Sequence, residues 1–282
     1  MKLLKQIVTL VFTSFLLFGF SFSIGIDSQN CDVVNDAFSS GEEVVYKIYY
    51  NWGFIWLESG EVTFKAEKDI YKGNPCYRLS GIGNTYPKYD WLMTVRDSFY
   101  AWVDSVNLRP YRCIRTEYEG SKYISEDCFF NHSKDKAYAV IKEKKKMPRL
   151  DSLSITKCSY DVLTMIYYAR NIDFSKYKKN DTIPLTMYLE NKIYPTYLRY
   201  LGKEVYKAEG IGKFNCVKFR AKLIPGTLFA GGESMTVWVT DDKNKIPLYI
   251  EAPILIGSVK AKMIKYRGLR HEVTSMIVGE KK

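Results

Sequence analysis

Apolar and polar residues alternate along most of this chain, in short segments that are separated by turn sequences. In Gly60–Glu67, for example, Val62, Phe64 and Ala66 occupy every second position. Successive side chains of a strand point to opposite faces, so a period of two predicts strands with one buried face. Tyr, Phe and Trp, which favour strands, make up 15% of the residues. We therefore expect a chain that folds mainly into antiparallel sheet.

Strands are predicted wherever such a segment is bounded by turn-forming residues. These segments are Glu43–Asn51, Gly60–Glu67, Cys76–Ile82, Leu92–Val103, Arg112–Glu119, Lys122–Phe129, Ala137–Ile141, Ile183–Glu190, Ile193–Tyr200, Lys203–Glu209, Lys213–Leu223, Ser234–Thr240, Pro247–Ala252 and Ser258–Tyr266, with a last strand near Arg270–Ile277. No linker divides them, so residues 41–278 are expected to form a single β-rich domain. A sheet of this length has to curl or close, which predicts a strongly curved antiparallel sheet or an incomplete β-barrel.

The strand rhythm is interrupted in the middle of the chain. Lys142–Lys146 (KEKKK) opens a polar stretch that runs to about residue 157, and we expect a solvated loop there. Ser159 resembles an N-cap, and apolar residues recur behind it at helical spacing. A helix over Ser159–Arg170 is therefore predicted, packed with its apolar face against the concave side of the sheet.

The first 25 residues have the features of a secretory signal peptide. Lys2 and Lys5 precede an apolar run from Ile7 to Phe22, and small residues follow this run. A transmembrane span needs about 20 apolar residues, so the run is short for one. Cleavage is expected near Ser23 or Gly25, and an uncleaved signal anchor is the alternative.

The mature chain is expected to be exported, and to be periplasmic or associated with the outer envelope. Cys31 is not expected to be lipidated, because the residues before it lack the apolar-then-small pattern that lipidation requires. No later segment is long and apolar enough to cross a bilayer. The formal net charge of +11 favours an anionic membrane surface, lipopolysaccharide or acidic glycan over nucleic acid as a partner. A solvated, lysine-rich surface explains the charge equally well.

Two cysteines are predicted to face each other across a hairpin. A two-residue loop at Gly120-Ser121 places Glu119 opposite Lys122 and, counting outward, Cys113 opposite Cys128. Directly opposed strand residues lie within the range of a disulfide. A disulfide between these two cysteines is predicted, and two buried free thiols on facing strands are the alternative.

Familiar catalytic and metal-binding patterns are absent from the sequence. His132 and His271 are the only histidines, and neither has a ligand partner at metal-binding spacing, so no metal and no cofactor is predicted. No P-loop, dinucleotide fingerprint or G-x-S-x-G elbow occurs, and no catalytic residue is assigned. Asp97, Asp104 and the Asp241-Asp242 pair remain as carboxylate candidates, with turns and ion pairs as the competing explanation.

Two apolar loops are candidates for a lid over a ligand. Leu228 and Phe229 lie among the glycines of PGTLFAGG, and Ile254 and Leu255 lie in APILIG. Large apolar side chains in loops either fold back onto the core or cover a binding surface. We predict these four residues as ligand-binding lid residues, and capping of the core is the alternative.

Several short motifs follow one another in an order that is shared with one known family. They are Gly41-Glu42, Ser59-Gly60-Glu61-Val62, Arg96-Asp97, Leu108-Arg109-Pro110, Glu119-Gly120 with Tyr123, Asp161-Val162-Leu163, Tyr167-Tyr168-Ala169-Arg170, Val237-Trp238-Val239-Thr240-Asp241-Asp242, Ile246-Pro247 and Ile256-Gly257-Ser258-Val259. Through them the chain resembles the exported bacterial family catalogued as domain of unknown function 3108. Related chains often have Asp-Pro-Leu at the helix start, where this chain has Asp-Val-Leu.

That family has no established activity, so the resemblance implies no catalytic residue. It implies a fold similar to periplasmic half-barrels that carry lipoproteins or lipids, in which a curved antiparallel sheet wraps a helix. The favoured hypothesis is a binding or carrier module for an apolar or amphipathic envelope molecule, with a lipid or lipid-anchored molecule as partner. A structural envelope protein with a filled interior and a carboxylate-based hydrolase are the alternatives.

Overall fold

The strands and helices are taken from a computed structural model that describes residues 33–52, 54–89, 91, 94–224, 232–254 and 257–277. The strands are β1 (Glu42–Trp52), β2 (Ile55–Tyr71), β3 (Asn74–Thr85), β4 (Arg96–Asp104), β5 (Pro110–Glu119), β6 (Lys122–Asn131), β7 (Lys136–Glu143), β8 (Arg149–Ser154), β9 (Ser159–Asp161), β10 (Thr182–Leu189), β11 (Lys192–Ala208), β12 (Gly212–Leu223), β13 (Gly232–Thr240), β14 (Pro247–Pro253), β15 (Ser258–Arg267) and β16 (Met276–Ile277). The helices are α2 (Val162–Ala169) and two short 3-10 turns, η1 (Pro87–Tyr89) and η2 (Phe174–Lys176).

Nearly all strands join one continuous sheet, in the order β8-β7-β6-β5-β4-β3-β2-β1-β15-β14-β13-β12-β11-β10-β9, with β16 beside β12. Neighbours in this order are also neighbours in the chain, except at the antiparallel pair of β1 and β15. Strands β8 and β9 follow each other in the chain but form the two ends of the sheet. Within the described residues the molecule is therefore an open barrel, and the prediction of a curved sheet or incomplete barrel is confirmed.

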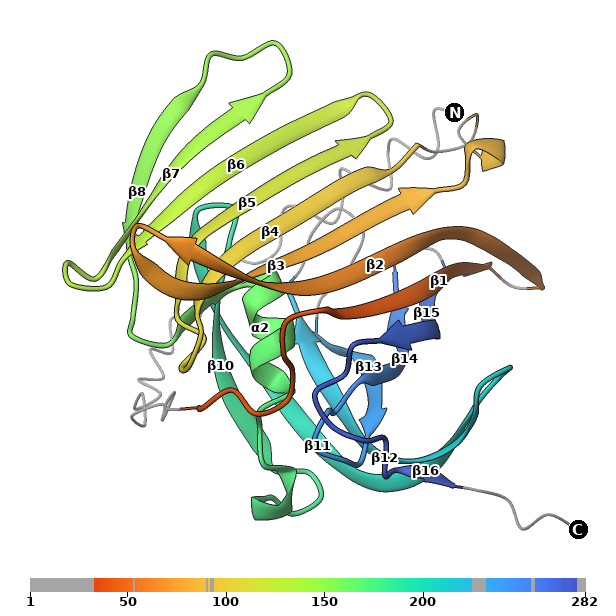
Figure 1. Cartoon of the computed structure of the whole chain (residues 1–282). Coiled ribbons are helices and arrows are strands. Elements are labelled where there is room, and N and C mark those ends of the chain that lie inside the picture. The colour runs from red at the N-terminus through yellow and green to blue at the C-terminus, as the bar shows by residue number, and fades with distance from the viewer. Residues whose placement is uncertain are drawn as a thin grey trace, which may run out of the picture.

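The sheet curves around α2, with β2–β8 on one side of the helix and β10–β15 on the other (Figure 1). We call the face of the sheet that surrounds α2 the inner face. Leu163 and Tyr167 of α2 pack into the apolar cluster of β2–β7, and Tyr168 packs into the cluster of β10–β13. Each buried side chain of this size contributes about 2 kcal/mol to stability. The helix thus joins two halves that meet in the sheet at the β1–β15 pair.

The helix starts three residues later than predicted. Asp161, not Ser159, is the N-cap, and its Oδ1 accepts the backbone N–H groups of Leu163 at 3.0 Å and Thr164 at 3.1 Å. Ser159 belongs to β9, which pairs in parallel with β10. The backbone N–H of Ser159 donates to the Thr156 carbonyl at 3.1 Å, and the Ser159 hydroxyl accepts the Thr156 N–H at 2.9 Å. Ser159 therefore closes the turn before β9 and does not cap the helix.

Three other strand predictions are corrected. The polar stretch predicted as a loop contains β8, an edge strand whose side chains are mostly exposed and show no alternation. The predicted strands Ile193–Tyr200 and Lys203–Glu209 form one long strand, β11. A bulge at Gly202, with φ +102°, lets strand pairing continue between them. The predicted last strand is reduced to Met276–Ile277, which pairs with β12.

Candidate binding site on the inner face of the sheet

One face of α2 lies between the two apolar clusters. Leu163 and Tyr167 face one apolar cluster, and Tyr168 faces the other. Because successive helix residues are offset by about 100°, the side chain of Ile166 lies on the strip of the helix between these two contact faces. Ile166 points to the same side as Arg170, whose guanidinium bonds Glu42 on β1. Although the helix is wrapped by the sheet, the side chain of Ile166 is 36% exposed. Apolar surface is therefore accessible on the side of α2 that faces β1.

The wall beside this helix face is also apolar and incompletely covered. Phe64, Gly81 and Phe99 stand directly opposite one another on β2, β3 and β4, and both phenylalanines are half-buried. A Cβ atom at Gly81 would lie 3.0 Å from the Phe64 ring and 3.5 Å from Leu163. Glycine at this position allows the ring and the helix to approach the same strand.

Charged residues gather at the helix N-terminus, where β4, β5 and β6 face the β10–β11 hairpin. We call this group the Arg115 cluster; it comprises Asp97, Arg115, Glu117, Glu126 and Glu190. The Arg115 guanidinium lies 2.8 Å from Glu117, 3.2 Å from Glu190 and 3.3 Å from Glu126. Burial alone would lower the pKa of Arg115, but the three carboxylates raise it. The arginine is thus held in its charged form.

Glu126 connects this cluster to the β10–β11 hairpin. The Tyr188 hydroxyl donates to Glu126 Oε1 at 2.5 Å, and the backbone N–H of Asn191 donates to the same oxygen at 3.1 Å. Burial raises the pKa of Tyr188 first of all, and the neighbouring Cys128 and Glu126 add to the effect. These bonds attach one end of the open sheet to the inner face of the other half.

A small cavity lies beside the cluster, between Arg115, Val162 and Tyr188. Its volume of about 20 Å³ suits roughly one water molecule and no larger ligand. Within the described part of the chain, Arg115 Nε and Asn191 Oδ1 are buried atoms without a hydrogen-bond partner. One donor and one acceptor therefore remain unsatisfied close to Glu126.

Two carboxylates have a raised pKa: Asp97 of the cluster and Asp161 at the N-terminus of α2. Burial raises the pKa of Asp97 to about 6, against the lowering effect of the Tyr118 N–H group, and the charges of Glu117 and Glu119 raise it further. Burial also raises the pKa of Asp161 to about 6, although the first turn of α2 donates hydrogen bonds to it. Both carboxyl groups are therefore held part-way to protonation near pH 6.

Two of the other carboxylates named as catalytic candidates close turns, and the third, Asp241, pairs with the Lys203 ammonium group at 2.7 Å. Asp104 Oδ1 accepts the N–H groups of Val106 and Asn107, each at 2.9 Å, at the end of β4 remote from Asp97. Asp242 Oδ1 accepts the Thr240 hydroxyl at 2.9 Å and a backbone N–H at 3.0 Å in the β13–β14 turn. The structure does not bring these carboxylates together.

The predicted lid residues are described only in part. Leu228, Phe229 and Leu255 lie outside the described residues. Ile254 is half-buried, and its backbone N–H donates to the Gly257 carbonyl at 3.1 Å across the β14–β15 turn. The lid therefore stays a prediction. No group of three possible metal ligands occurs among the residues that the structure describes.

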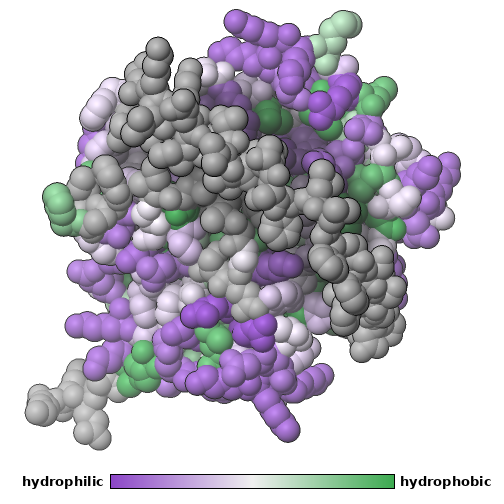
Figure 2. Space-filling model, turned by 180° about the vertical axis from the view of Figure 1, so that it is seen from behind, coloured by the Kyte–Doolittle hydropathy of each residue, from purple (hydrophilic) through white to green (hydrophobic). Residues whose placement is uncertain are grey.

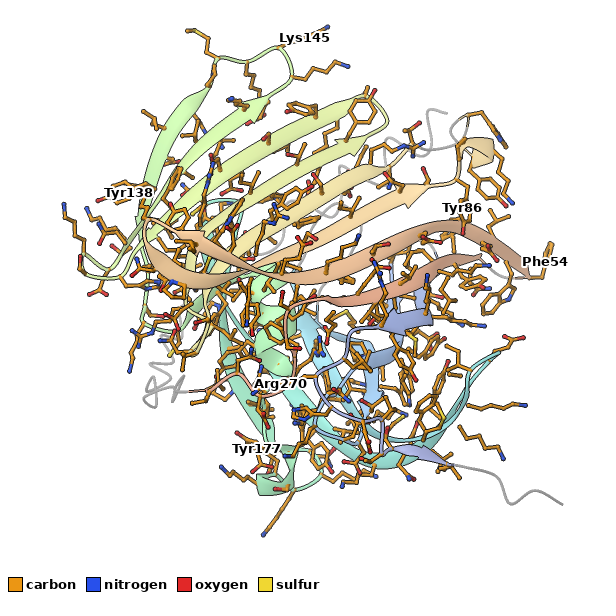
Figure 3. The ribbon with its side chains drawn as sticks, in the orientation of Figure 1. Phe54, Tyr86, Tyr138, Lys145, Tyr177 and Arg270 are labelled. Atoms are coloured by element: carbon orange, nitrogen blue, oxygen red, sulfur yellow. The ribbon has the colours of Figure 1, made fainter. Side chains whose placement is uncertain are left out.

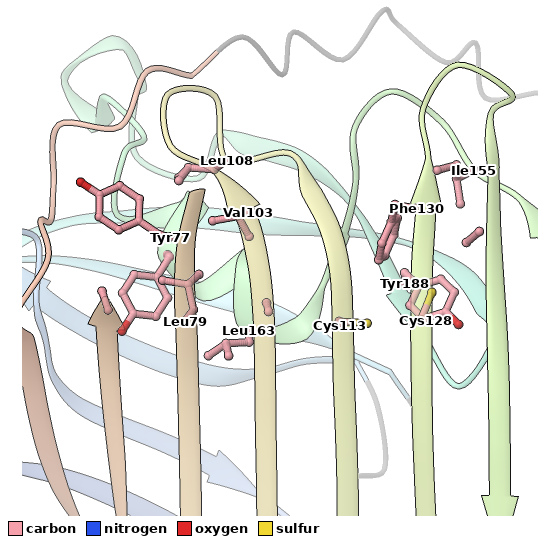
Figure 4. Close-up of a cluster of buried hydrophobic side chains, with 14 of the residues drawn as sticks. Tyr77, Leu79, Val103, Leu108, Cys113, Cys128, Phe130, Ile155, Leu163 and Tyr188 are labelled. Carbon is pink, nitrogen blue, oxygen red and sulfur yellow. The ribbon is translucent and has the colours of Figure 1, made fainter. Parts of the chain in front are cut away.

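The two hairpin cysteines occupy the predicted register. Cys113 stands opposite Cys128 on β5 and β6, and both side chains belong to the buried cluster around Leu163 (Figure 4). Both are free, so the predicted disulfide is not formed in the structure and the alternative of two buried thiols describes them. A hydrogen bond with Cys128 and burial raise the pKa of the Cys113 thiol. Cys158, by contrast, is disulfide-bonded.

Several of the sequence motifs meet at a buried ion pair that sequence reasoning did not find. Arg170 bonds both carboxylate oxygens of Glu42, at 2.5 and 2.8 Å, and its Nε donates to the Asn244 carbonyl at 3.0 Å. These residues come from the start of β1, the end of α2 and the β13–β14 turn. The signal in the sequence that could have indicated this ion pair is that Glu42 and Arg170 carry opposite charges and lie in two separate motifs. The motifs thus mark a structural contact.

The comparison with protein-family models gives the same assignment as these motifs. A model described as "Protein of unknown function (DUF3108)" matches residues 45–264. The chain belongs to the DUF3108 family. No curated protein matches it. Among its described residues, this DUF3108 protein has no helix with the length and apolarity that a membrane span requires.

A solved structure supports the fold assignment. The DUF3108 chain is similar to the crystal structure of a β-barrel-like protein of domain of unknown function DUF1849 from Brucella abortus, with a TM-score of 0.53 and 10% sequence identity. The similarity covers 83% of this chain and 97% of the other. At such low identity it shows a shared β-barrel-like fold.

Proposed function

We propose that this DUF3108 protein is an exported binding or carrier module, which holds the apolar part of an amphipathic envelope molecule between α2 and β1–β4. The observation that carries the proposal is the 36% exposure of Ile166 on a helix that the sheet wraps. Half-buried Phe64 and Phe99 extend this apolar surface along the inner wall. Apolar surface inside a concave sheet is typical of sites for apolar ligands.

One feature supports a binding role over a catalytic one, and another supports a place in the envelope. The carboxylates of Asp104 and Asp242 are engaged by turn N–H groups and hydroxyls, which leaves them poorly placed to act on a substrate. The disulfide at Cys158 is typical of proteins that mature in an oxidising compartment, as an exported protein does.

A second candidate is a structural interaction protein whose interior is filled by its own side chains. The cavity beside Arg115, at about 20 Å³, favours this alternative, since no lipid fits there. The two candidates differ in one respect that can be measured. A carrier retains a small amphipathic molecule when it is purified, and a filled scaffold does not.

Native mass spectrometry of protein purified from the envelope fraction tests the proposal. Ile166→Gln places an amide on the exposed face of α2, and we expect at least a five-fold loss of the lipid adduct seen with the natural protein. Ile82→Gln is the matched control, because Ile82 is 37% exposed and its neighbours Gly81 and Gly83 face inward, which puts it on the outer face of β3. Circular dichroism establishes that both variants fold. Absence of an adduct from the natural protein, or equal loss in both variants, overturns the carrier and leaves the scaffold.

A further inference from the structure

The turns at one end of the half-barrel form a continuous edge. The Tyr86 N–H donates to the Ser59 carbonyl at 2.9 Å, which places the β3–β4 turn against the β1–β2 hairpin. The Gly120 N–H donates to Thr94 at 2.8 Å, and the Lys144 N–H donates to Tyr123 at 3.2 Å. The turns β1–β2, β3–β4, β5–β6 and β7–β8 therefore follow one another, and we call this edge the rim. Phe54, Tyr86 and Lys145 mark it in Figure 3.

Large aromatic side chains project from one part of the rim. Phe54 is 95% exposed, Trp91 is 81% exposed and Trp56 is 53% exposed. Single exposed apolar residues are common on protein surfaces, and Figure 2 shows small separate hydrophobic areas on the back of the molecule. Three such aromatic residues, in the β1–β2 turn, at the start of β2 and in the β3–β4 turn, differ from this background, because Trp and other aromatic rings are favoured at the headgroup level of membranes.

Arg96 gives the aromatic part of the rim a fixed base. Its Nη1 donates to the carbonyl of Thr85 at 3.0 Å and to that of Val95 at 2.7 Å, and these two residues flank the β3–β4 turn. The turn that carries Trp91 is therefore attached to the sheet at both of its ends.

Lysines accompany the aromatic residues and extend along the rim. The ammonium group of Lys88 lies 4.9 Å from the centre of the Tyr89 ring. Farther along, Lys122 and Lys144 line a surface groove of about 370 Å³ between the β5–β6 and β7–β8 turns. Lysines close to an anionic bilayer strengthen binding through their charge.

We propose that the rim docks onto the surface of an anionic lipid bilayer. Phe54 and Trp91 enter the headgroup region, while Lys144 and its neighbours in the β7–β8 turn contact the phosphates. The choice of a bilayer as occupant follows from charge: the formal net charge of +11 for the whole sequence stays strongly positive without Lys2 and Lys5 of the predicted signal peptide, and it complements an anionic surface. The docking surface is separate from Ile166 and from any ligand on the inner face.

Flotation of the purified protein with lipid vesicles tests this proposal. We expect binding to vesicles of phosphatidylglycerol and phosphatidylcholine, and binding at least five-fold weaker to phosphatidylcholine alone. Phe54→Ser combined with Trp91→Ser is expected to reduce binding at least ten-fold. Ile70→Ser is the matched control and retains binding, because Ile70 is 71% exposed on β2 at the opposite end of the sheet.

A second pair of variants tests the role of charge. Replacing Lys144, Lys145 and Lys146 with Gln is expected to weaken binding to anionic vesicles more than the same change at Lys72, Lys134 and Lys136, which lie near turns of the opposite end. Equal effects of the two triple variants, unchanged binding after the aromatic substitutions, or failure of the natural protein to bind vesicles overturns the proposal. The Ile166→Gln variant is expected to bind vesicles like the natural protein. Failure of the carrier proposal can therefore be distinguished from failure of the docking proposal.

Discussion

Two buried arginines hold the two halves of this half-barrel together, and their surroundings differ. Arg170 is enclosed, with a fully buried Glu42 on two of its nitrogen atoms and the Asn244 carbonyl on the third. Arg115 faces three carboxylates, and one of them, Glu190, is 51% exposed. Its Nε has no hydrogen-bond partner among the described residues. Arg170 thus has one opposite charge and a hydrogen-bond partner for each nitrogen atom. Arg115 has three opposite charges and one nitrogen atom without a partner among the described residues.

This difference indicates which end of the molecule can change. A buried ion pair with every group satisfied resists local opening, because separating it leaves a charge in an apolar environment. The Arg115 cluster has surplus negative charge, two unsatisfied atoms and a small cavity, so opening there costs less. We therefore expect the Glu42 end to be rigid and the β10–β11 hairpin to separate more readily from β6.

The largest expected effect comes from removing the charge of Glu42. Glu42→Gln leaves the Arg170 guanidinium buried without a counter-ion, and should lower the free energy of unfolding by about 3–5 kcal/mol. Asp127→Asn is the control, because the Arg112–Asp127 pair lies 2.7 Å apart with both side chains 29% exposed. That change should cost less than about 1 kcal/mol. Urea unfolding measures both, and similar losses would contradict the contrast.

An intermediate loss of stability is expected at the Arg115 cluster, where the loss should differ between the Glu126 and Glu190 variants. Glu126→Gln weakens buried bonds from Tyr188, Asn191 and Arg115, and should lower the free energy of unfolding by about 2 kcal/mol. Glu190→Gln alters a half-exposed carboxylate and should cost less than about 1 kcal/mol. Hydrogen exchange of the β10–β11 amides should rise only in the Glu126 variant. A larger cost for the Glu190 variant would mean that the outer carboxylate, and not Glu126, holds the hairpin.

The smallest expected effect is a gain in stability that depends on pH. The pKa of Asp97 rises from its ordinary value of 3.8 to about 6 on folding, so the folded protein binds more protons than the unfolded chain between about pH 4 and 6. Stability therefore falls as the pH rises through this range. Asp97→Asn lacks the titrating group, and should be more stable than the natural protein by about 1–2 kcal/mol at pH 7. Melting curves recorded at pH 4 and pH 7 should show the gain at pH 7 alone.

Much of the fold could be predicted from local sequence. The alternation in Gly60–Glu67 and the two-residue loop at Gly120-Ser121 both act over a few residues, and both predictions are confirmed by the pairing of the strands. The strand β8 escaped prediction because an edge strand pairs through its backbone alone, and its side chains carry no pattern. The cap at Asp161 was missed because Ser159 closes the turn before β9 instead.

Less of the candidate site could be predicted. Leu228, Phe229 and Leu255 were chosen for their apolar character in loops, and they lie outside the described residues. Ile166 lies within the helix that was predicted with an apolar face, but spacing along the helix does not tell which part of that face the sheet will cover. The predicted register of the Gly120-Ser121 hairpin already places Arg115 opposite Glu126. No spacing along the chain relates this pair to Asp97 on β4 or to Glu190 in the β10–β11 hairpin.

The sequence alone determined that this chain forms many short antiparallel strands with one helix in their midst, because alternation, turn residues and helical spacing are local properties. Only the tertiary structure decided that β1 pairs with β15, that the sheet stays open between β8 and β9, and that Glu42 bonds Arg170 across 128 residues. Contacts between distant segments depend on how whole elements pack, and a single sequence carries no local pattern for them.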